Sequence, residues 1–339
     1  MSTIPAPQQS SLARGHSSAS ELVVGLDIGG SKTHGALWRS GTLVGEAKSG
    51  SANVQNVTPD DAARSLGELF NGLLGPEDPE AIGHVVAGSG GVDTPADAER
   101  LRALIAVRAP RAVIDVVHDT RLILAAGGAR TGIAVIAGTG SVAWGVAEGG
   151  REARSGGWGY LLGDEGSGYW VAREAARRAL HREDLGMEPD VLDTAVLALN
   201  GVATATELIG LFHSGARSSR TYWAAQSRAV FDAARDGHGD AAGIIDRAAS
   251  DLTRLVLDVA SVIGPAGPVV LGGGLATHQP DLQTRLREHL AANGITDIVF
   301  LTEDPVMGVR FLVADRAQDR LRTPSGVTSG ADGRSVTHP

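Results

Sequence analysis

The chain of 339 residues contains no cysteine. Without thiols it can hold neither a disulfide, nor an iron–sulfur cluster bound by thiolates, nor a cysteine-based zinc site. None of its ten histidines forms an HxxxH pair, which further weakens a zinc interpretation. The sequence therefore excludes thiol-ligated metal centres and the redox chemistry that depends on them.

A surplus of basic residues is also absent, because the formal net charge is −9. Binding to nucleic acid through counterion release needs clustered Lys and Arg, which the sequence does not contain. We therefore expect no nucleic-acid partner.

Long hydrophobic segments are missing as well. No run of 18 apolar residues occurs, and the first twenty residues lack the apolar core of a signal peptide. We expect a cytoplasmic protein with no membrane partner. Residues 1–20 are rich in Ser, Ala and Pro, and residues 323–339 in Ser, Gly and Thr, a composition that predicts two disordered tails.

What the chain does contain is one hairpin motif in two copies. Residues 22–32 form an apolar strand that runs into a glycine turn, and residues 133–141 repeat this pattern. Each copy continues into a second apolar segment and then a short polar strand, at 46–50 and 152–156. The chain also exceeds the length at which single cores stop growing, so we expect two similar domains. Because glycine turns let backbone amides approach an anion, two such turns could clamp a phosphate.

Helices and strands alternate between the two hairpins, which predicts right-handed crossovers and a partly parallel sheet. After the second hairpin, apolar residues recur at helical spacing, and one further strand is expected. The predicted helices are at 59–74, 96–107, 121–126, 164–181, 190–199, 204–212, 218–235, 240–263, from 280 onward and 308–321, and the further strands are at 82–87, 113–117 and 268–271.

Two apolar strands end in a carboxylate. Asp27 closes the first strand, where a carboxylate without a cation or donor would be costly, and it is a candidate ligand of Mg²⁺ through water. A turn cap is the alternative. Asp119 follows the strand at 113–117, and ligands of open α/β sheets bind at carboxyl ends of strands. It could act as general base toward a sugar hydroxyl, or simply cap the next helix.

Two more glycine-rich segments fit ligand binding. In residues 156–168, Trp158 offers an apolar face for a sugar ring, and Asp164 and Glu165 offer hydrogen-bond acceptors for its hydroxyls. Both acids could instead cap a helix. In residues 269–275 a strand meets three glycines and then a helix, which suits a nucleotide base or ribose, or an ordinary βα turn.

In this order the motifs resemble the BadF/BadG/BcrA/BcrD ATPase-like family, and within it the N-acetylglucosamine kinases of the animal type, which belong to the actin, hexokinase and Hsp70 superfamily. The likeness extends from about Val23 to Ala317. It implies an α/β fold of two ribonuclease H-like domains around a nucleotide cleft. The N-terminal domain would span 21–118 and the C-terminal domain 119–322, with a helical insertion.

The resemblance also implies a role for individual residues. Asp119 would take the proton from the 6-hydroxyl of the sugar, while Asp27 stays the candidate Mg²⁺ ligand on the grounds given above. The substrate-binding residues would be Asn53, Asp119, Ser141, Gly157, Trp158, Gly159 and Asp164. The ATP-binding residues would be Gly29, Gly30, Ser31, Lys32, Thr33, Gly138, Thr139, Gly140, Gly272, Gly273 and Gly274.

The implied function is an ATP- and Mg²⁺-dependent kinase of an amino sugar, most closely N-acetylglucosamine. Positioning groups, one carboxylate and Mg²⁺ suffice for phosphoryl transfer. Glucosamine is an alternative substrate, and a catalytically inactive sugar- or nucleotide-binding regulator is an alternative function. The absent cysteines exclude the family branch that activates acyl-CoA reductases and dehydratases, and they disfavour a zinc-containing ROK-type kinase. A homodimer is usual among similar kinases.

Overall fold

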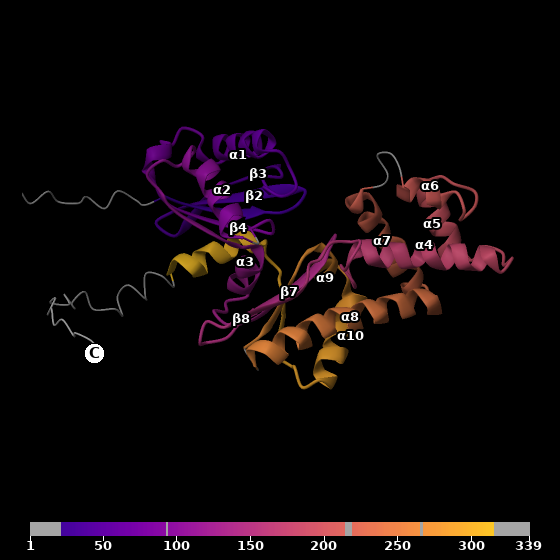
Figure 1. The fold of residues 1–339 in the computed structure, drawn as a ribbon. Coiled ribbons are helices and arrows are strands. Elements are labelled where there is room, and N and C mark those ends of the chain that lie inside the picture. Colours follow the sequence, from indigo (N-terminus) through magenta and orange to yellow (C-terminus); the bar gives the residue numbers. More distant parts are fainter. Residues whose placement is uncertain (1–21, 93, 214–218, 265–266, 315–339) are drawn as a thin grey trace, which may run out of the picture. The chain divides into compact units, whose positions relative to one another are not determined.

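The computed structural model describes residues 22–92, 94–213, 219–264 and 267–314 (Figure 1). Contacts between Cα atoms divide the chain into two compact units, of which the first ends at Val117 and the second begins at His118. Both predicted tails lie outside the described residues. Within those residues, no helix combines the length and the apolar character that crossing a membrane requires.

The first unit is built on a five-stranded sheet in the order β3-β2-β1-β4-β5. The predicted hairpin forms the antiparallel part of the sheet, and β4 lies parallel to β1. The strands are β1 (Leu22–Ile28), β2 (Lys32–Arg39), β3 (Thr42–Gly50), β4 (Ile82–Ser89) and β5 (Val113–His118), and the helices are α1 (Pro59–Leu74), α2 (Pro95–Ala106) and a 3₁₀ turn at Pro79–Ala81.

Helix α1 illustrates how local sequence sets an element. The Thr58 hydroxyl accepts a hydrogen bond from the Asp61 amide, Pro59 occupies the first turn, and Gly75 follows the helix at φ +54°. Its buried side chains recur at three- and four-residue spacing and pack into the core of this unit, at Ala62, Leu66, Leu69, Phe70 and Leu73.

The second unit repeats the first sheet, with the order β10-β9-β6-β7-β8. Again a hairpin forms the antiparallel part, while β9 and β10 run parallel to β6. The strands are β6 (Gly132–Ala137), β7 (Ser141–Val146), β8 (Glu152–Gly156), β9 (Val269–Gly272) and β10 (Ile298–Phe300). The predicted repeat of two similar sheets is therefore present.

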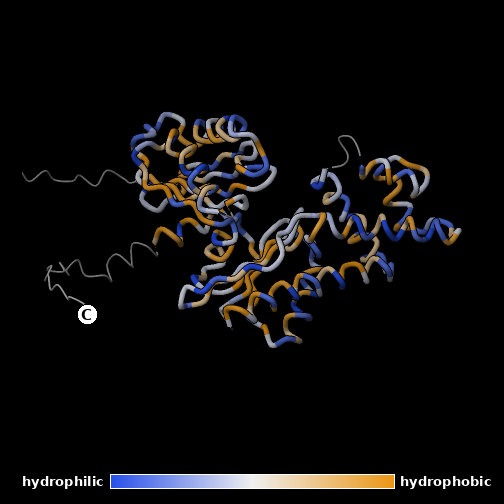
Figure 2. Tube along the Cα trace, in the orientation of Figure 1, coloured by the Kyte–Doolittle hydropathy of each residue, from blue (hydrophilic) through white to orange (hydrophobic). Residues whose placement is uncertain are grey.

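Side chains alternate along β6 and so divide the core of this unit in two. Ile133, Val135 and Ala137 join a large apolar cluster with the helices on one face, whereas Ala134 packs with α3 on the other. Along the Cα trace, hydrophobic and hydrophilic segments alternate in the helices of this unit (Figure 2). The helices are α3 (Asp119–Ala126), α4 (Gly168–Asp184), α5 (Val191–Asn200), α6 (Leu208–His213), α7 (Arg220–Arg235), α8 (Gly239–Ile263), α9 (Gly274–His278), α10 (Pro280–Ala292) and a 3₁₀ turn at Pro305–Gly308.

Two predicted helix starts need correction, and one strand was not predicted. Helix α4 begins at Gly168 and not at 164, because Asp164 and Gly166 have φ of +61° and +77° and the Ser167 hydroxyl caps the helix. Helix α6 begins at Leu208 instead of 204. Strand β10 has only three residues and was not predicted. Of the helix predicted at 308–321, residues 309–314 are helical and those from 315 onward lie outside the described residues.

Candidate active site

Two of the predicted ATP motifs meet at the carboxyl ends of neighbouring strands in the second sheet. Strands β6 and β9 are parallel neighbours, with Ile136 opposite Gly272, so the turns that follow them lie together. A Cβ added to Gly138 would lie 3.7 Å from the backbone nitrogen of Gly274. Gly273 has φ +89°, and a Cβ there would lie 2.6 Å from the Ala137 carbonyl oxygen. The close approach of these turns therefore requires glycine at 273.

The segment of residues 157–168 is tied to the same glycine turn. The Ser141 hydroxyl donates to the Glu165 carbonyl at 2.7 Å, and its amide donates to Asp164 Oδ1 at 3.3 Å. The Gly168 amide, at the start of α4, donates to the Gly138 carbonyl at 2.8 Å. The structure thus joins the predicted phosphate turn and the predicted sugar segment into one assembly.

Asp164 is the centre of this assembly. The residue is 3% exposed, and a Cβ on Gly140 would lie 2.9 Å from Oδ2, so the carboxylate packs directly on the glycine turn. Burial raises the pKa of Asp164, while the Ser141 amide and Arg220 act in the opposite direction. Because Ser167 caps α4, the alternative that Asp164 caps a helix is wrong.

One oxygen of Asp164 remains available as an acceptor. Oδ2 is buried and receives no hydrogen bond within the described part of the chain. The nearest cation is Arg220, whose Nη1 lies 3.5 Å away, a distance at which attraction between charges outweighs hydrogen bonding. A sugar hydroxyl could satisfy this oxygen, whose burial without a donor is otherwise unfavourable.

Trp158 presents its indole to solvent, at 64% exposure. The Arg154 guanidinium lies 5.1 Å from the ring centroid and donates to the Gly157 carbonyl at 2.7 Å. Gly157 and Gly159, on either side, have φ of +72° and +78°. The backbone thus turns sharply around the indole, and Arg154 fixes its orientation.

Asp119 is the first residue of α3, and the residue that caps this helix is His118, whose side chain accepts from the Thr120 amide. The alternative that Asp119 is the cap is therefore wrong. Its carboxylate is 20% exposed, and Oδ1 lies 2.9 Å from His118 Nδ1. Because His118 caps α3, the Asp119 carboxylate is not needed as a helix cap.

In the first unit the glycine turn is supported from inside. The Ser51 hydroxyl donates to the Gly29 carbonyl at 2.8 Å, and the Thr33 hydroxyl accepts from the Ala52 amide at 3.1 Å. Thr33 is fully buried. Gly30, Ser31 and Lys32 form the tip of the turn and are exposed. The tip is the part that a phosphate could reach.

Asn53 is buried beside a glycine that the sequence analysis missed. Its Oδ1 accepts from the Gln55 amide at 3.0 Å, and a Cβ on Gly91 would lie 2.1 Å from that oxygen. Only glycine fits at 91 beside this side chain. The signal that could have found it is the glycine pair at 90–91, directly after strand β4.

Asp27 lies in β1 opposite His34 of β2. Among the described residues, no three His, Asp or Glu side chains gather in a way that could hold a metal ion. The described side chains therefore do not form a complete metal site by themselves. A single carboxylate such as Asp27 fits Mg²⁺, which keeps several waters and takes one or two carboxylates beside phosphate oxygens.

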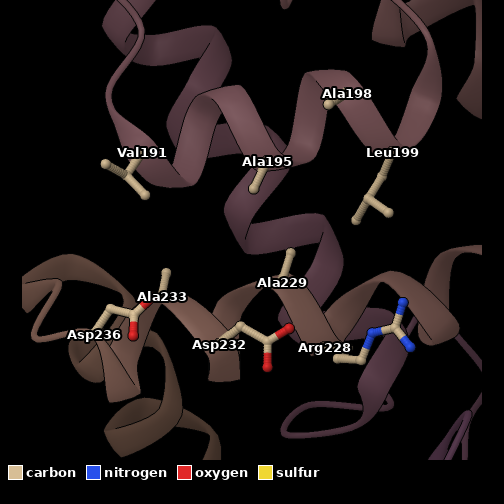
Figure 3. Close-up of a pocket in the computed structure, with 9 residues that line it drawn as sticks. All are labelled: Val191, Ala195, Ala198, Leu199, Arg228, Ala229, Asp232, Ala233 and Asp236. Carbon is tan, nitrogen blue, oxygen red and sulfur yellow. The ribbon is translucent and has the colours of Figure 1, made fainter.

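Several pockets of the described structure lie outside the predicted site, among them the following two. One of about 440 Å³ lies between α5 and α7, where small apolar side chains form the floor and Arg228, Asp232 and Asp236 stand at the rim (Figure 3). Another of about 530 Å³ is lined by Tyr160 and Leu161 together with residues of α4 and α6. Neither is lined by a predicted catalytic or ATP-binding residue.

The sequence matches the family model described as the BadF/BadG/BcrA/BcrD ATPase family over residues 24–308. The chain belongs to this family. It is 32% identical over 284 residues to the N-acetylmuramic acid/N-acetylglucosamine kinase of Clostridium acetobutylicum, covering 80% of this chain and 91% of that one. It is 26% identical over 310 residues to the N-acetyl-D-glucosamine kinase of Dictyostelium discoideum, covering 86% and 97%.

Two solved structures of sugar kinases share this fold. A Porphyromonas gingivalis protein assigned as an N-acetylglucosamine kinase aligns with a TM-score of 0.72 at 21% identity, covering 87% of this chain and 99% of that one. A ROK family glucokinase from Streptomyces griseus, in complex with glucose and AMPPNP, aligns with a TM-score of 0.56 at 16% identity, covering 88% and 99%. The predicted fold class, α/β with two ribonuclease H-like domains, is confirmed.

Proposed function

We propose that this chain is a kinase that transfers the γ-phosphoryl group of ATP to the 6-hydroxyl of N-acetylglucosamine. The observation that carries the proposal is the buried Asp164, which has an acceptor oxygen to spare and packs on the glycine turn at Gly138–Gly140. A hydroxyl-binding group in direct contact with a phosphate-binding turn is what a sugar kinase needs.

ATP would be held by backbone. The turn at 138–140 lies against Gly273 and Gly274, so backbone with few side chains gathers at the carboxyl ends of β6 and β9. The exposed tip at Gly30, Ser31 and Lys32 is the proposed counterpart from the first hairpin. Asp27 would hold Mg²⁺, which supplies positive charge to the phosphates when bound.

The sugar would be held by Asp164, Asn53, Ser141 and the loop around Trp158. Asp164 Oδ2 would accept a ring hydroxyl, and the exposed indole would cover an apolar face of the ring. Asp119 would accept the proton of the 6-hydroxyl as that oxygen attacks phosphorus, because its carboxylate is not used to cap α3.

We propose 21–118 and 119–322 as the bounds of the two domains.

N-acetylmuramic acid is a second candidate substrate. It is favoured by the Clostridium relative, whose name includes both sugars and which is 32% identical over most of this chain. Glucosamine remains an alternative from the same chemical class. A regulator without turnover is less well supported, because a protein that only binds sugar has no use for Asp119.

The test is ADP release coupled to NADH oxidation, with ATP, Mg²⁺ and a panel containing N-acetylglucosamine, N-acetylmuramic acid, glucosamine and glucose. We expect the N-acetylated sugars to stimulate release most, and phosphorus–proton NMR of the product to place phosphate on O6. Activity with glucosamine alone would assign glucosamine as the substrate in place of N-acetylglucosamine. The kinase proposal fails if no sugar stimulates ADP release.

A further inference from the structure

Arg220 reaches the predicted sugar segment from a distant part of the sequence. It is the first residue of α7, and its Nη1 lies 3.5 Å from Asp164 Oδ2. The same guanidinium lies 5.8 Å from the ring centroid of Tyr160, in the same segment. One side chain thus contacts both ends of the stretch 160–164.

The Asp164 carboxylate needs such a cation. It is nearly fully buried, its backbone has φ +61°, and the one hydrogen bond that it receives in the described chain is the 3.3 Å donation from the Ser141 amide. Burial favours the protonated acid. The charged groups that act on Asp164 are Arg220 on α7, which favours the carboxylate, and Glu165 in its own segment, which opposes it.

We propose that Arg220 is a positioning residue, whose guanidinium keeps Asp164 ionised and oriented so that Asp164 can accept hydrogen bonds from the sugar. This inference rests on the proposed function. A protonated Asp164 would offer one acceptor fewer to the sugar. Arg220 acts on the sugar only through Asp164.

The fold does not depend on Arg220. Its side chain is 39% exposed, and α7 is capped by Ser219, whose hydroxyl accepts from the Tyr222 amide. Arg220→Gln therefore removes the charge without removing the helix cap. Arg228 provides a matched control, because it is an exposed arginine on the same helix and lines the groove between α5 and α7.

The first experiment compares Arg220→Gln, Arg220→Lys and Arg228→Gln in steady-state kinetics from pH 5 to 9. In Arg220→Gln we expect the KM for sugar to rise about tenfold, as for a lost charge-assisted interaction, with little change in the KM for ATP. The acid limb of kcat/KM should move to higher pH, because the carboxylate is the active form and loses the cation that lowers its pKa. Arg220→Lys should restore most of both, and Arg228→Gln should match the wild type.

The second experiment has a readout that does not need turnover. Carboxyl ¹³C NMR of the sugar-free protein, with the Asp164 signal assigned by Asp164→Asn, should give a higher titration midpoint in Arg220→Gln than in the wild type. An unchanged midpoint, or an unchanged acid limb and sugar KM, overturns the inference. If the wild type phosphorylates no sugar, the proposed function fails by itself, and the NMR titration still decides whether Arg220 controls Asp164.

Discussion

The Nδ1 atom of His118 lies 2.9 Å from Oδ1 of Asp119, the carboxylate proposed as the general base. The same nitrogen lies 2.7 Å from the Thr120 hydroxyl and accepts from the Thr120 amide as the cap of α3. Oδ1 of Asp119 is buried and has no hydrogen-bond donor assigned to it in the described chain. His118 therefore caps the helix in place of Asp119.

Asp119→Ala should lower kcat at least about 10²-fold, the lower range for general base catalysis. The affinity for ATP, measured by calorimetry, should change little, and the melting temperature should stay close to that of the wild type because His118 and not Asp119 is the cap.

The complementary change is His118→Ala, which removes the cap and should cost about 1 kcal/mol of unfolding free energy in urea titrations. His118→Asn supplies another capping side chain and should restore it. If Asp119→Ala melts early and His118→Ala does not, the capping roles deduced from the structure are reversed.

Gly273 and its neighbour Gly274 should separate folding from nucleotide binding. Gly273→Ala combines φ +89° with a Cβ 2.6 Å from the Ala137 carbonyl oxygen, so it should lower the melting temperature. A Cβ on Gly274 meets no atom of the described chain within 4 Å, so Gly274→Ala should melt like the wild type while binding ATP more weakly in calorimetry. Unchanged ATP affinity in Gly274→Ala would argue against this turn as a nucleotide site.

A partly buried ionic cluster should make the helical part of the second unit sensitive to acid. Arg178 of α4 contacts Asp190, Asp193 and Asp240, and its exposure is 13% against 3% for Asp193. Burial opposes ionisation of Asp190, but hydrogen bonds from Arg178 and from the Asp193 amide outweigh it and hold the pKa of Asp190 well below its usual range. In Arg178→Gln, Asp193 keeps Arg182, whose Nε lies 2.8 Å from its Oδ2, so the change should cost about 1.5–3 kcal/mol of unfolding free energy, the range for hydrogen bonds to charged groups.

The sign of the pH effect follows from the lowered pKa. An unfolded Asp titrates near about pH 3.9, so the stabilisation by Asp190 is complete above that pH and is lost as pH falls through the lower folded value. Urea midpoints at pH 6 and pH 3 should therefore differ less in Asp190→Asn than in the wild type. Equal differences in the two proteins would contradict this reading of the cluster.

Much of the fold could be predicted, because its signals are local. The glycine hairpins and the strand and helix alternation were enough to expect two similar sheets, and Thr58-Pro59 marks the start of α1 in sequence as in structure. The start of α4 was misplaced, because two acids before an apolar run look like a first helical turn. The positive φ of Asp164 and Gly166 arises from packing against Gly140 and α8, which no local pattern encodes.

The candidate site was predictable as a set of motifs but not as an assembly. Asp164 and Gly140 were each singled out by sequence, yet their contact depends on how residues 157–168 fold back over the turn. Arg220 contacts Asp164, and Gly91 packs against Asn53, and both partners lie far away in sequence. No local pattern therefore reveals either contact. Three-residue β10 carries too little periodicity to be recognised and exists because β9 pairs with it.

The identical strand order of the two sheets suggests descent from a duplicated ancestral half. Between its third and fourth strands the first half has α1 as its one long helix, whereas the second half has α4 to α8 at the same point of the order. Added chain at that point interrupts no strand pairing and no glycine turn. We therefore expect relatives to differ in length there, and substrate range to have diversified through this appendage while the phosphate-handling frame stayed constant.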